Sequence, residues 1–334
     1  MNNLKKIGLT ALAASLVSTS VFAGDFAVTG SASMTVENYS GEQVNTGKAF
    51  SMGNSLTFKG SGELDNGLNI SASFTLDQGD DTYTVAGTAA APVGGGAPFD
   101  SHSLTVSSDA IGTIVFHGEG GDSAQNAVGD TAAGNIWDNF DKQQTGAAKL
   151  AESDATTNMI HYTLPSIVDG LTLAASYVPQ GTDDEAQTAY ALTYTGLVDG
   201  LTLKYGVGDD NDGTGALSNA EATSISATYA YGPMTFAYSD HDYDHETVLS
   251  SQDAKSMKLS YTVSDQISVS YGTDKLSNKA TAAVADAEYS KISADYTSGG
   301  MTVTVTAQEA ENMNYTNTST MDQDYWSLGL AFAF

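Results

Sequence analysis

The chain has 334 residues, of which 40 are Asp or Glu and 12 are Lys or Arg, giving a formal charge of -28 at pH 7. Every one of these cations is a lysine, and the chain contains no cysteine. This composition excludes a nucleic-acid-binding protein, whose surface must attract phosphates, and it excludes disulfide frameworks, thiolate metal sites and cysteine nucleophiles.

The N-terminal segment, residues 1–23, has the three parts of a secretory signal peptide. Lys5 and Lys6 give a positive start, an apolar and small-residue stretch follows at 7–21, and Ala23 ends a small-residue cleavage pattern. The alternative is an N-terminal helix of the folded domain. Cleavage after Ala23 leaves a mature domain over 24–334, whose charge is 10 minus 40, or -30.

The rest of the chain alternates between apolar and polar residues. At the start of the mature domain, apolar residues occupy even-numbered positions and so share one parity: Phe26, Val28, Ala32, Met34 and Val36. The same alternation returns at 68–76, 201–205, 257–263 and 301–305. Successive side chains of a strand point to opposite faces, so each segment predicts a strand with one apolar and one polar face. Lengths of about 8 to 12 residues suit strands that cross a bilayer at a tilt.

Short and long connections alternate along the chain. Short turns rich in Gly, Asp, Asn and Pro are expected at 64–67, 108–111, 165–170, 196–200, 231–233, 264–266 and 298–300. Longer loops are expected at 38–50, 78–100, 118–157, 179–187, 208–221, 241–254, 273–287 and 309–322. These connections join about sixteen antiparallel strands, and their alternation predicts an all-β transmembrane barrel with turns at one end and loops at the other.

The last strand has a distinct terminal pattern. Its apolar residues share one face and end on an aromatic residue: Trp326, Leu328, Leu330, Phe332 and Phe334. This pattern resembles the signal that the outer-membrane barrel assembly machinery reads, which implies that machinery as a partner.

Two local segments resemble a known family. Residues 158–165, which read Asn-Met-Ile-His-Tyr-Thr-Leu-Pro, with 169–173 and Tyr177, are similar to the strand–turn–strand that follows the third loop of Gram-negative general diffusion porins. Residues 111–116 are similar to the strand that leads into the constriction loop of those porins. The resemblance implies a homotrimer with an inward-folded loop at 118–157. The family usually places an arginine cluster at the constriction, and this chain has none.

Charged side chains on the polar parity predict the lining of a lumen. The expected wall residues are Lys59, His117, His161, Lys204, Lys258 and Lys291. The expected constriction-loop acids are Glu119, Asp122, Asp130, Asp138 and Asp141. Ile136, Trp137 and Phe140 could hold a helical turn of the loop against the wall. Because carboxylates outnumber amines, the expected channel favours cations.

Two segments have spacings that could bind metal. Residues 210–221 match the twelve-residue EF-hand pattern for Ca²⁺, with candidate ligands Asp210, Asp212, Thr214, Ser218 and Glu221. Their flanks read as strands rather than helices, and a chance match is the alternative. Residues 240–246 could place His241 and His245 on one face, although a solvated loop is the favoured interpretation there.

The sequence therefore predicts an outer-membrane porin for the passive diffusion of small hydrophilic solutes and ions. It is expected to contact lipid and lipopolysaccharide, to need no cofactor apart from a candidate Ca²⁺ at the outer loops, and to have no enzymatic activity, because no catalytic constellation is recognisable. The alternative is a secreted or surface-attached β-rich binding or adhesion protein with a soluble sandwich fold.

Overall fold

The computed structural model describes residues 24–41, 48–77, 99–140, 157–179, 186–210, 220–245, 251–279 and 285–334. The expected signal peptide, 1–23, lies outside these residues. The helices among them are short 3-10 turns: η1 (Ala124–Val128), η2 (Ile136–Asn139), η4 (Met313–Tyr315) and η5 (Ser319–Met321). None of the described helices has the length and apolar character needed to span a membrane.

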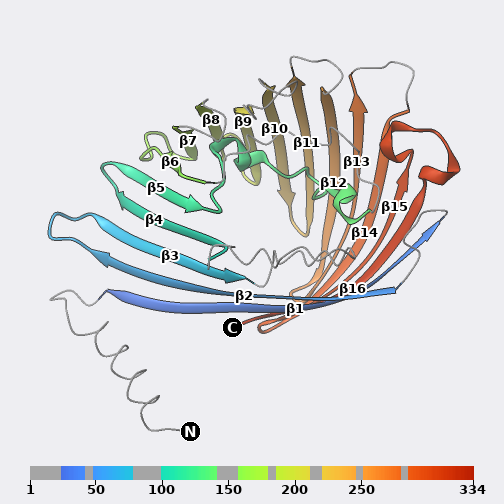
Figure 1. Ribbon diagram of the computed structural model, residues 1–334, viewed down its shortest axis with the longest axis horizontal. Coiled ribbons are helices and arrows are strands. Elements are labelled where there is room, and N and C mark those ends of the chain that lie inside the picture. Colours follow the sequence, from blue (N-terminus) through green and yellow to red (C-terminus); the bar gives the residue numbers. More distant parts are fainter. Residues whose placement is uncertain are drawn as a thin grey trace, which may run out of the picture.

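Sixteen antiparallel strands among the described residues close into a barrel, in which each strand pairs with the next along the chain and β16 pairs with β1 (Figure 1). The strands are β1 (Asp25–Gly41), β2 (Lys48–Glu63), β3 (Asn69–Asp77), β4 (Ser101–Ser108), β5 (Gly112–Glu119), β6 (Met159–Thr163), β7 (Leu171–Val178), β8 (Gln187–Tyr194), β9 (Leu201–Asp210), β10 (Ala220–Tyr231), β11 (Met234–His245), β12 (Gln252–Ser264), β13 (Ile267–Asn278), β14 (Ala287–Ser298), β15 (Met301–Glu311) and β16 (Gln323–Ala333). The predicted fold is confirmed, and the alternative of a soluble sandwich is wrong.

The strand register keeps apolar side chains together on the outer face. Phe58 of β2 is opposite Val28 of β1 on one side and Phe74 of β3 on the other. Its neighbour Lys59 is opposite Ala27 and Ser73, on the inner face. A one-residue slip between two strands would reverse the faces of every residue, so the alternation in the sequence fixes this register.

The short turns fall where the sequence predicts them, whereas several strands extend further at the loop end. β1 reaches Gly41, β11 reaches His245 and β13 reaches Asn278, so the loops predicted from 38, 241 and 273 begin later. The interpretation of 240–246 as a solvated loop is wrong for its first six residues, which continue β11. In this part of β11 the outer-face positions are occupied by Asp240, Asp242 and Asp244 instead of apolar residues. The alternation of apolar and polar residues that predicts a strand is therefore not visible there.

The C-terminal residue closes the seam between the first and last strands. The backbone N–H of Phe334 donates to the carbonyl of Gly30 (2.9 Å), and the N–H of Gly30 donates back to Phe334 (2.7 Å). A Cβ on Gly30 would meet the ring of Phe334 at 2.6 Å, so glycine leaves the space that this ring occupies. Phe334 itself is 71% exposed on the outer face.

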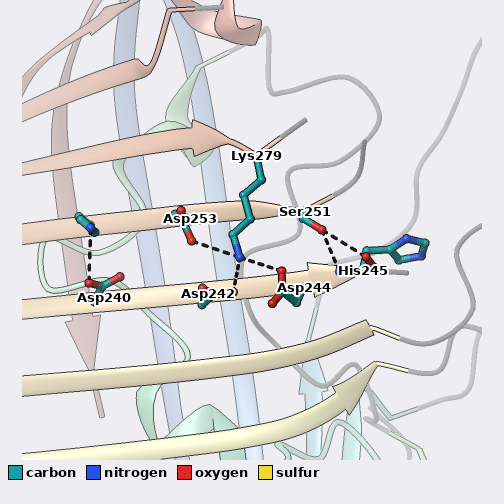
Figure 2. A network of polar contacts seen from close by, with 8 residues as sticks. Asp240, Asp242, Asp244, His245, Ser251, Asp253 and Lys279 are labelled. Atoms are coloured by element: carbon teal, nitrogen blue, oxygen red, sulfur yellow. Dashed lines mark hydrogen bonds and ion pairs between the residues drawn. The ribbon is translucent and has the colours of Figure 1, made fainter. Parts of the chain in front are cut away.

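The outer face of β11 to β13 carries a lysine-centred ion cluster at the loop end (Figure 2). The amine of Lys279 contacts Asp242 (2.6 Å), Asp244 (2.8 Å) and Asp253 (3.5 Å). Asp242 and Asp253 are directly opposite each other on adjacent strands, where two like charges repel. Burial lowers the pKa of Lys279, but hydrogen bonds to Asp242 and Asp244 outweigh it and raise this pKa above its ordinary value. Lys279 therefore stays charged and offsets the repulsion.

We predict that Lys279→Gln destabilises the barrel by about 1 kcal/mol, the upper end for ion pairs that are partly exposed. Because the pKa of Lys279 is raised on folding, its contribution is complete below pH ~10.4, the ordinary lysine value, and is lost as the pH rises further. Urea unfolding of the detergent-folded protein at several pH values measures both effects.

The matched control is Lys255→Gln, since Lys255 is 60% exposed and makes a longer contact of 3.8 Å to Asp240. This variant should change the free energy of unfolding by much less. Equal losses for the two variants would contradict the role given to Lys279.

Candidate functional site

The loop after β5 turns into the barrel and follows the inside of one part of its wall. Its first turn, η1, packs against β7 to β10, and its second turn, η2, packs against β13 and β14. Figure 1 shows this green segment crossing the barrel interior along these strands. The described part of the loop therefore narrows the lumen from the β7–β14 side. Residues 141–156, with Asp141, lie outside the described residues.

Wall side chains accept hydrogen bonds from the backbone of this loop. A buried N–H without a partner is costly, and serine hydroxyls on β7, β11 and β12 supply three of the four acceptors. The contacts are Ala124 N to Ser176 Oγ (2.8 Å), Ala132 N to Ser239 Oγ (2.8 Å), Ala133 N to Ser256 Oγ (2.9 Å) and Ile136 N to Asp274 Oδ2 (2.7 Å). The side-chain amide of Gln125 adds a donor to Ser224 Oγ (2.8 Å). We call Ser176, Ser224, Ser239, Ser256 and Asp274 the acceptor row.

Two glycines of the wall let the loop approach closely. A Cβ on Gly206 of β9 would lie 2.7 Å from the carbonyl oxygen of Gln125, and a Cβ on Gly272 of β13 would lie 2.8 Å from the Cβ of Ala133. Both contacts are shorter than real Cβ contacts, so any other residue would push the loop into the lumen.

The main apolar cluster lies inside the barrel, where the loop meets the wall. Ile136, Trp137 and Phe140 are almost fully buried, as the sequence predicts for residues that hold a helical turn. They pack with Leu276 of β13 and Tyr289 of β14, and the rings of Phe140 and Tyr289 lie 5.7 Å apart. Burial of such side chains stabilises a fold by about 1.5–3 kcal/mol each. The cluster therefore holds η2 on the wall.

The predicted loop acids have different surroundings. Asp122, Asp130 and Asp138 are exposed on the loop. The first two accept hydrogen bonds from side-chain amides within the loop, Asn126 to Asp122 (2.9 Å) and Asn135 to Asp130 (2.8 Å). Glu119 is the last residue of β5 rather than part of the loop. The loop thus presents three carboxylates over its described length.

Crowding changes the acidity of one of these carboxylates. Partial desolvation, followed by the negative charges of Asp130 and Asp274, raises the pKa of Asp138 above its ordinary value. Asp138 therefore binds a proton at a higher pH than an isolated aspartate.

The predicted wall residues lie at four places on the inner face. His117 and His161 lie under the entry of the loop, where His161 forms a hydrogen bond with the backbone of Asp122. The amine of Lys204 donates a hydrogen bond to the carbonyl oxygen of Ala127 (3.1 Å). Lys258 and Lys291 line a cavity beside Ala133. Lys59 is exposed on β2, outside the strands that the two loop turns contact.

The family model described as Gram-negative porin matches residues 8–334. The chain belongs to the Gram-negative porin family. The barrel is a channel of the bacterial outer membrane. No curated protein matches this porin by sequence.

Solved porins share the fold at low sequence identity. An anion-selective porin from Comamonas acidovorans is 13% identical with a TM-score of 0.69, over 93% of this chain and 100% of that one. A Salmonella typhi OmpF in complex with daunomycin is 13% identical with a TM-score of 0.66, over 93% and 98%. A loop-deleted OmpT, an outer membrane protein of Vibrio cholerae, is 13% identical with a TM-score of 0.66, over 93% and 99%.

The two candidate metal sites of the porin have different outcomes. Most of 210–221 lies outside the described residues, and the described ends of this segment are Asp210 at the end of β9 and the first two residues of β10. In β11, His241 and His245 do share the inner face, with buried side chains. His241 binds the hydroxyl of Ser224 through Nδ1 (2.9 Å), so it supports the acceptor row. No group of metal-binding side chains is found in the described part of the chain.

The acceptor row is the feature that the sequence prediction missed. Its members are small polar residues at the inner parity of neighbouring strands, and this parity could have marked Ser224, Ser239 and Ser256 as places where a loop packs. The pairing of each acceptor with one loop N–H depends on the barrel register, which no local pattern contains.

We predict that Gly206→Val forces η1 away from the wall, destabilises the porin by about 1–3 kcal/mol through overpacking and lowers its single-channel conductance. The reason is that the added side chain occupies the space of the Gln125 backbone. Planar-bilayer recordings measure the conductance, and urea unfolding measures the stability.

Gly60→Val is the matched control, because a Cβ there has no atom within 4 Å and the residue lies on the outer face. Its conductance should equal that of the unmodified porin. An unchanged conductance for Gly206→Val would contradict the close approach of loop and wall.

Proposed function

We propose that this porin is a passive diffusion channel for small hydrophilic solutes and ions, and that it prefers cations to anions. The observation that carries the preference is the charge of the loop, since residues 120–140 contain Asp122, Asp130 and Asp138 but no lysine. Fixed charges beside a narrow aqueous passage attract ions of the opposite sign. The proposal includes no catalytic step.

The wall lysines offset only part of this field, because the three loop carboxylates lie on the exposed side of the loop. Lys204 keeps its charge while it donates a hydrogen bond to the carbonyl of Ala127, Lys258 and Lys291 lie on the wall beside Ala133, and Lys59 lies on β2, away from the strands that η1 and η2 contact. The Comamonas porin is anion-selective, whereas the present chain carries a net charge of -28 and no arginine. The same barrel fold can therefore carry opposite ion selectivities, anion preference in the Comamonas porin and the cation preference proposed here, when the charges in the lumen differ.

We predict stepwise currents when the folded porin enters a planar bilayer. In a salt gradient, the sign of the reversal potential should show that cations cross more readily than anions. Asp138→Asn should reduce this potential at neutral pH. Since the pKa of Asp138 is raised above 3.8, the cation preference of the unmodified porin should begin to fall, on acidification, above that pH. The variant should show less of this pH dependence.

The control for this measurement is Asp65→Asn, which removes one carboxylate from the turn between β2 and β3 and leaves the loop unchanged. It should leave the reversal potential within error of the unmodified porin. Anion preference in the unmodified porin would refute the charge argument, and absence of channels from folded protein would refute the proposed function.

We also propose that divalent cations and lipopolysaccharide cover the outer face at the loop end. Acidic residues are directly opposite each other there, Glu288 with Glu311 and Glu309 with Asp324. Among the described residues, Lys275 contacts Glu288 (3.3 Å) but none of the other three acids. Like charges at such positions are destabilising, and Ca²⁺ bound by carboxylate oxygens would offset the repulsion. Ca²⁺ binding by 210–221 remains a prediction of the same kind.

If Ca²⁺ bridges these carboxylates, a chelator should lower the melting temperature of the porin in lipopolysaccharide-containing bilayers, and added Ca²⁺ should restore it. The chelator's effect should shrink when Glu288 and Glu311 are both replaced by Gln. A melting temperature that the chelator leaves unchanged would contradict this proposal.

Three further proposals follow from the sequence and the family. Residues 1–23 are removed as a signal peptide, the terminal strand with Phe334 is read by the barrel assembly machinery, and three copies of the chain associate. Native mass spectrometry of the porin purified from outer membranes measures both the N-terminus of the mature chain and the number of copies.

A further inference from the structure

A small polar cavity lies in the inner wall beside the constriction loop, with a volume of ≈ 190 Å³. It is lined by Ala133, Lys258, Ser270, Gly272, Lys291, Ser293, Asp295, Thr304 and Thr306. Ala133 is the loop residue among them, and the other residues lie on β12 to β15. A cavity of this size has room for about six water molecules, at about 30 Å³ each.

The two lysines lie on either side of a glycine of the wall. Gly272 of β13 is directly opposite Lys258 of β12 and Lys291 of β14, so the three residues form one row on the inner face. Adjacent strands are about 4.8 Å apart, which places the two lysine backbones about 10 Å apart. Ala133 of the loop packs over Gly272, where a Cβ would lie 2.8 Å from the Cβ of Ala133, and the cavity lies beside this contact with both lysines in its lining.

Neither lysine amine is neutralised by a direct contact. Within the part of the chain that the structure describes, neither Lys258 nor Lys291 forms an ion pair or a hydrogen bond, although Lys204 and Lys279 both do. Both side chains are half-buried. A half-buried ammonium loses part of its hydration, so it gains more from an anionic partner than an exposed one.

The other polar groups of the cavity already have partners, and the partner of Thr306 is Ser327, outside the cavity (2.6 Å). Ser270 and Ser293 share a hydrogen bond (2.9 Å), and Thr304 donates to Oδ1 of Asp295 (2.7 Å). The two amines are thus the charged donors that remain for a ligand. The residues that line the cavity carry two positive charges and the one negative charge of Asp295, which leaves a net positive charge for a ligand with a single negative charge. Asp274 of β13 does not line the cavity, but its negative charge also acts on Lys291.

We propose that this cavity is a binding site for small monovalent carboxylates, which pause there beside the constriction while they cross the channel. The carboxylate lies between the amines of Lys258 and Lys291, and Asp295 disfavours a second negative charge. This proposal rests on the proposed channel function and adds a solute class to it.

The position of the site explains how a cation-preferring channel can serve such solutes. Ala133 lies between Asp130 and Asp138 along the loop, and the cavity extends from it toward the short-turn end of β12 to β15. A small carboxylate that passes the loop acids reaches the two amines directly. The attraction there offsets part of the repulsion by the loop.

The test uses lactate, with the folded porin in detergent and in planar bilayers. Ligand-observed NMR titration measures lactate binding without any need for conduction. The double variant Lys258→Gln/Lys291→Gln should bind lactate at least about threefold more weakly, the effect of losing partly exposed ion pairs. In a potassium lactate gradient, this variant should show a lower lactate-to-potassium permeability ratio.

The control Lys59→Gln removes one lumen lysine from β2 and should leave lactate binding unchanged. Phosphate, which is mostly the dianion at pH 7.5, should bind more weakly than lactate to the unmodified porin. Equal lactate binding by the double variant and the unmodified porin would overturn the site, and tighter phosphate binding would overturn the assigned solute class.

The two measurements separate this inference from the proposed function. Currents in potassium chloride with no lysine-dependent lactate binding would refute the site and leave the channel intact. Lysine-dependent lactate binding without any current would support the site and refute the channel.

Discussion

Backbone hydrogen bonding in a membrane without water is the constraint on which the structure depends. Hydrocarbon offers no partner to an N–H or C=O group, so strands can cross only when every edge is paired. Here β16 completes the pairing by joining β1, and the reciprocal bonds between Phe334 and Gly30 extend it to the last residue. Closure makes an inside and an outside, and the alternation of the strands then places apolar side chains in lipid and polar ones in the lumen.

The same constraint acts again inside the barrel. A loop that folds into the lumen brings N–H groups that no strand can pair, and the wall meets them with the acceptor row, one hydroxyl or carboxylate for each of four loop N–H groups. Glycines at 206 and 272 let the backbone come close enough for these bonds. The apolar cluster around Trp137 then adds the burial that a soluble protein would place in its core. Loop position, and with it the width of the channel, is set by polar contacts, close approach and burial together.

How much of this could be predicted from the sequence depended on whether the signal was local. Side-chain alternation and the Gly, Asp and Asn turns are local, so the faces of the strands and the short turns were predicted well. The outer ends of strands such as β11 were missed, since Asp240, Asp242 and Asp244 carry the outer parity into a region where charge replaces apolarity. The acceptor row was missed because it is defined across β7 to β13, and its members are neighbours only after the barrel has closed. The cavity between Lys258 and Lys291 was missed for the same reason, although both lysines were assigned to the lumen.

The absence of arginine is physically meaningful in this arrangement. Arginine offers a rigid planar fork that holds an oxyanion in one geometry, whereas lysine is a compact charge on a flexible stem. In this chain one wall lysine, Lys204, supports the loop backbone, and two others lie on either side of Gly272, in the lining of the cavity beside Ala133. The acids remain on the exposed side of the loop. Positive charge is therefore placed on the wall beside the loop rather than at the exposed surface of the loop.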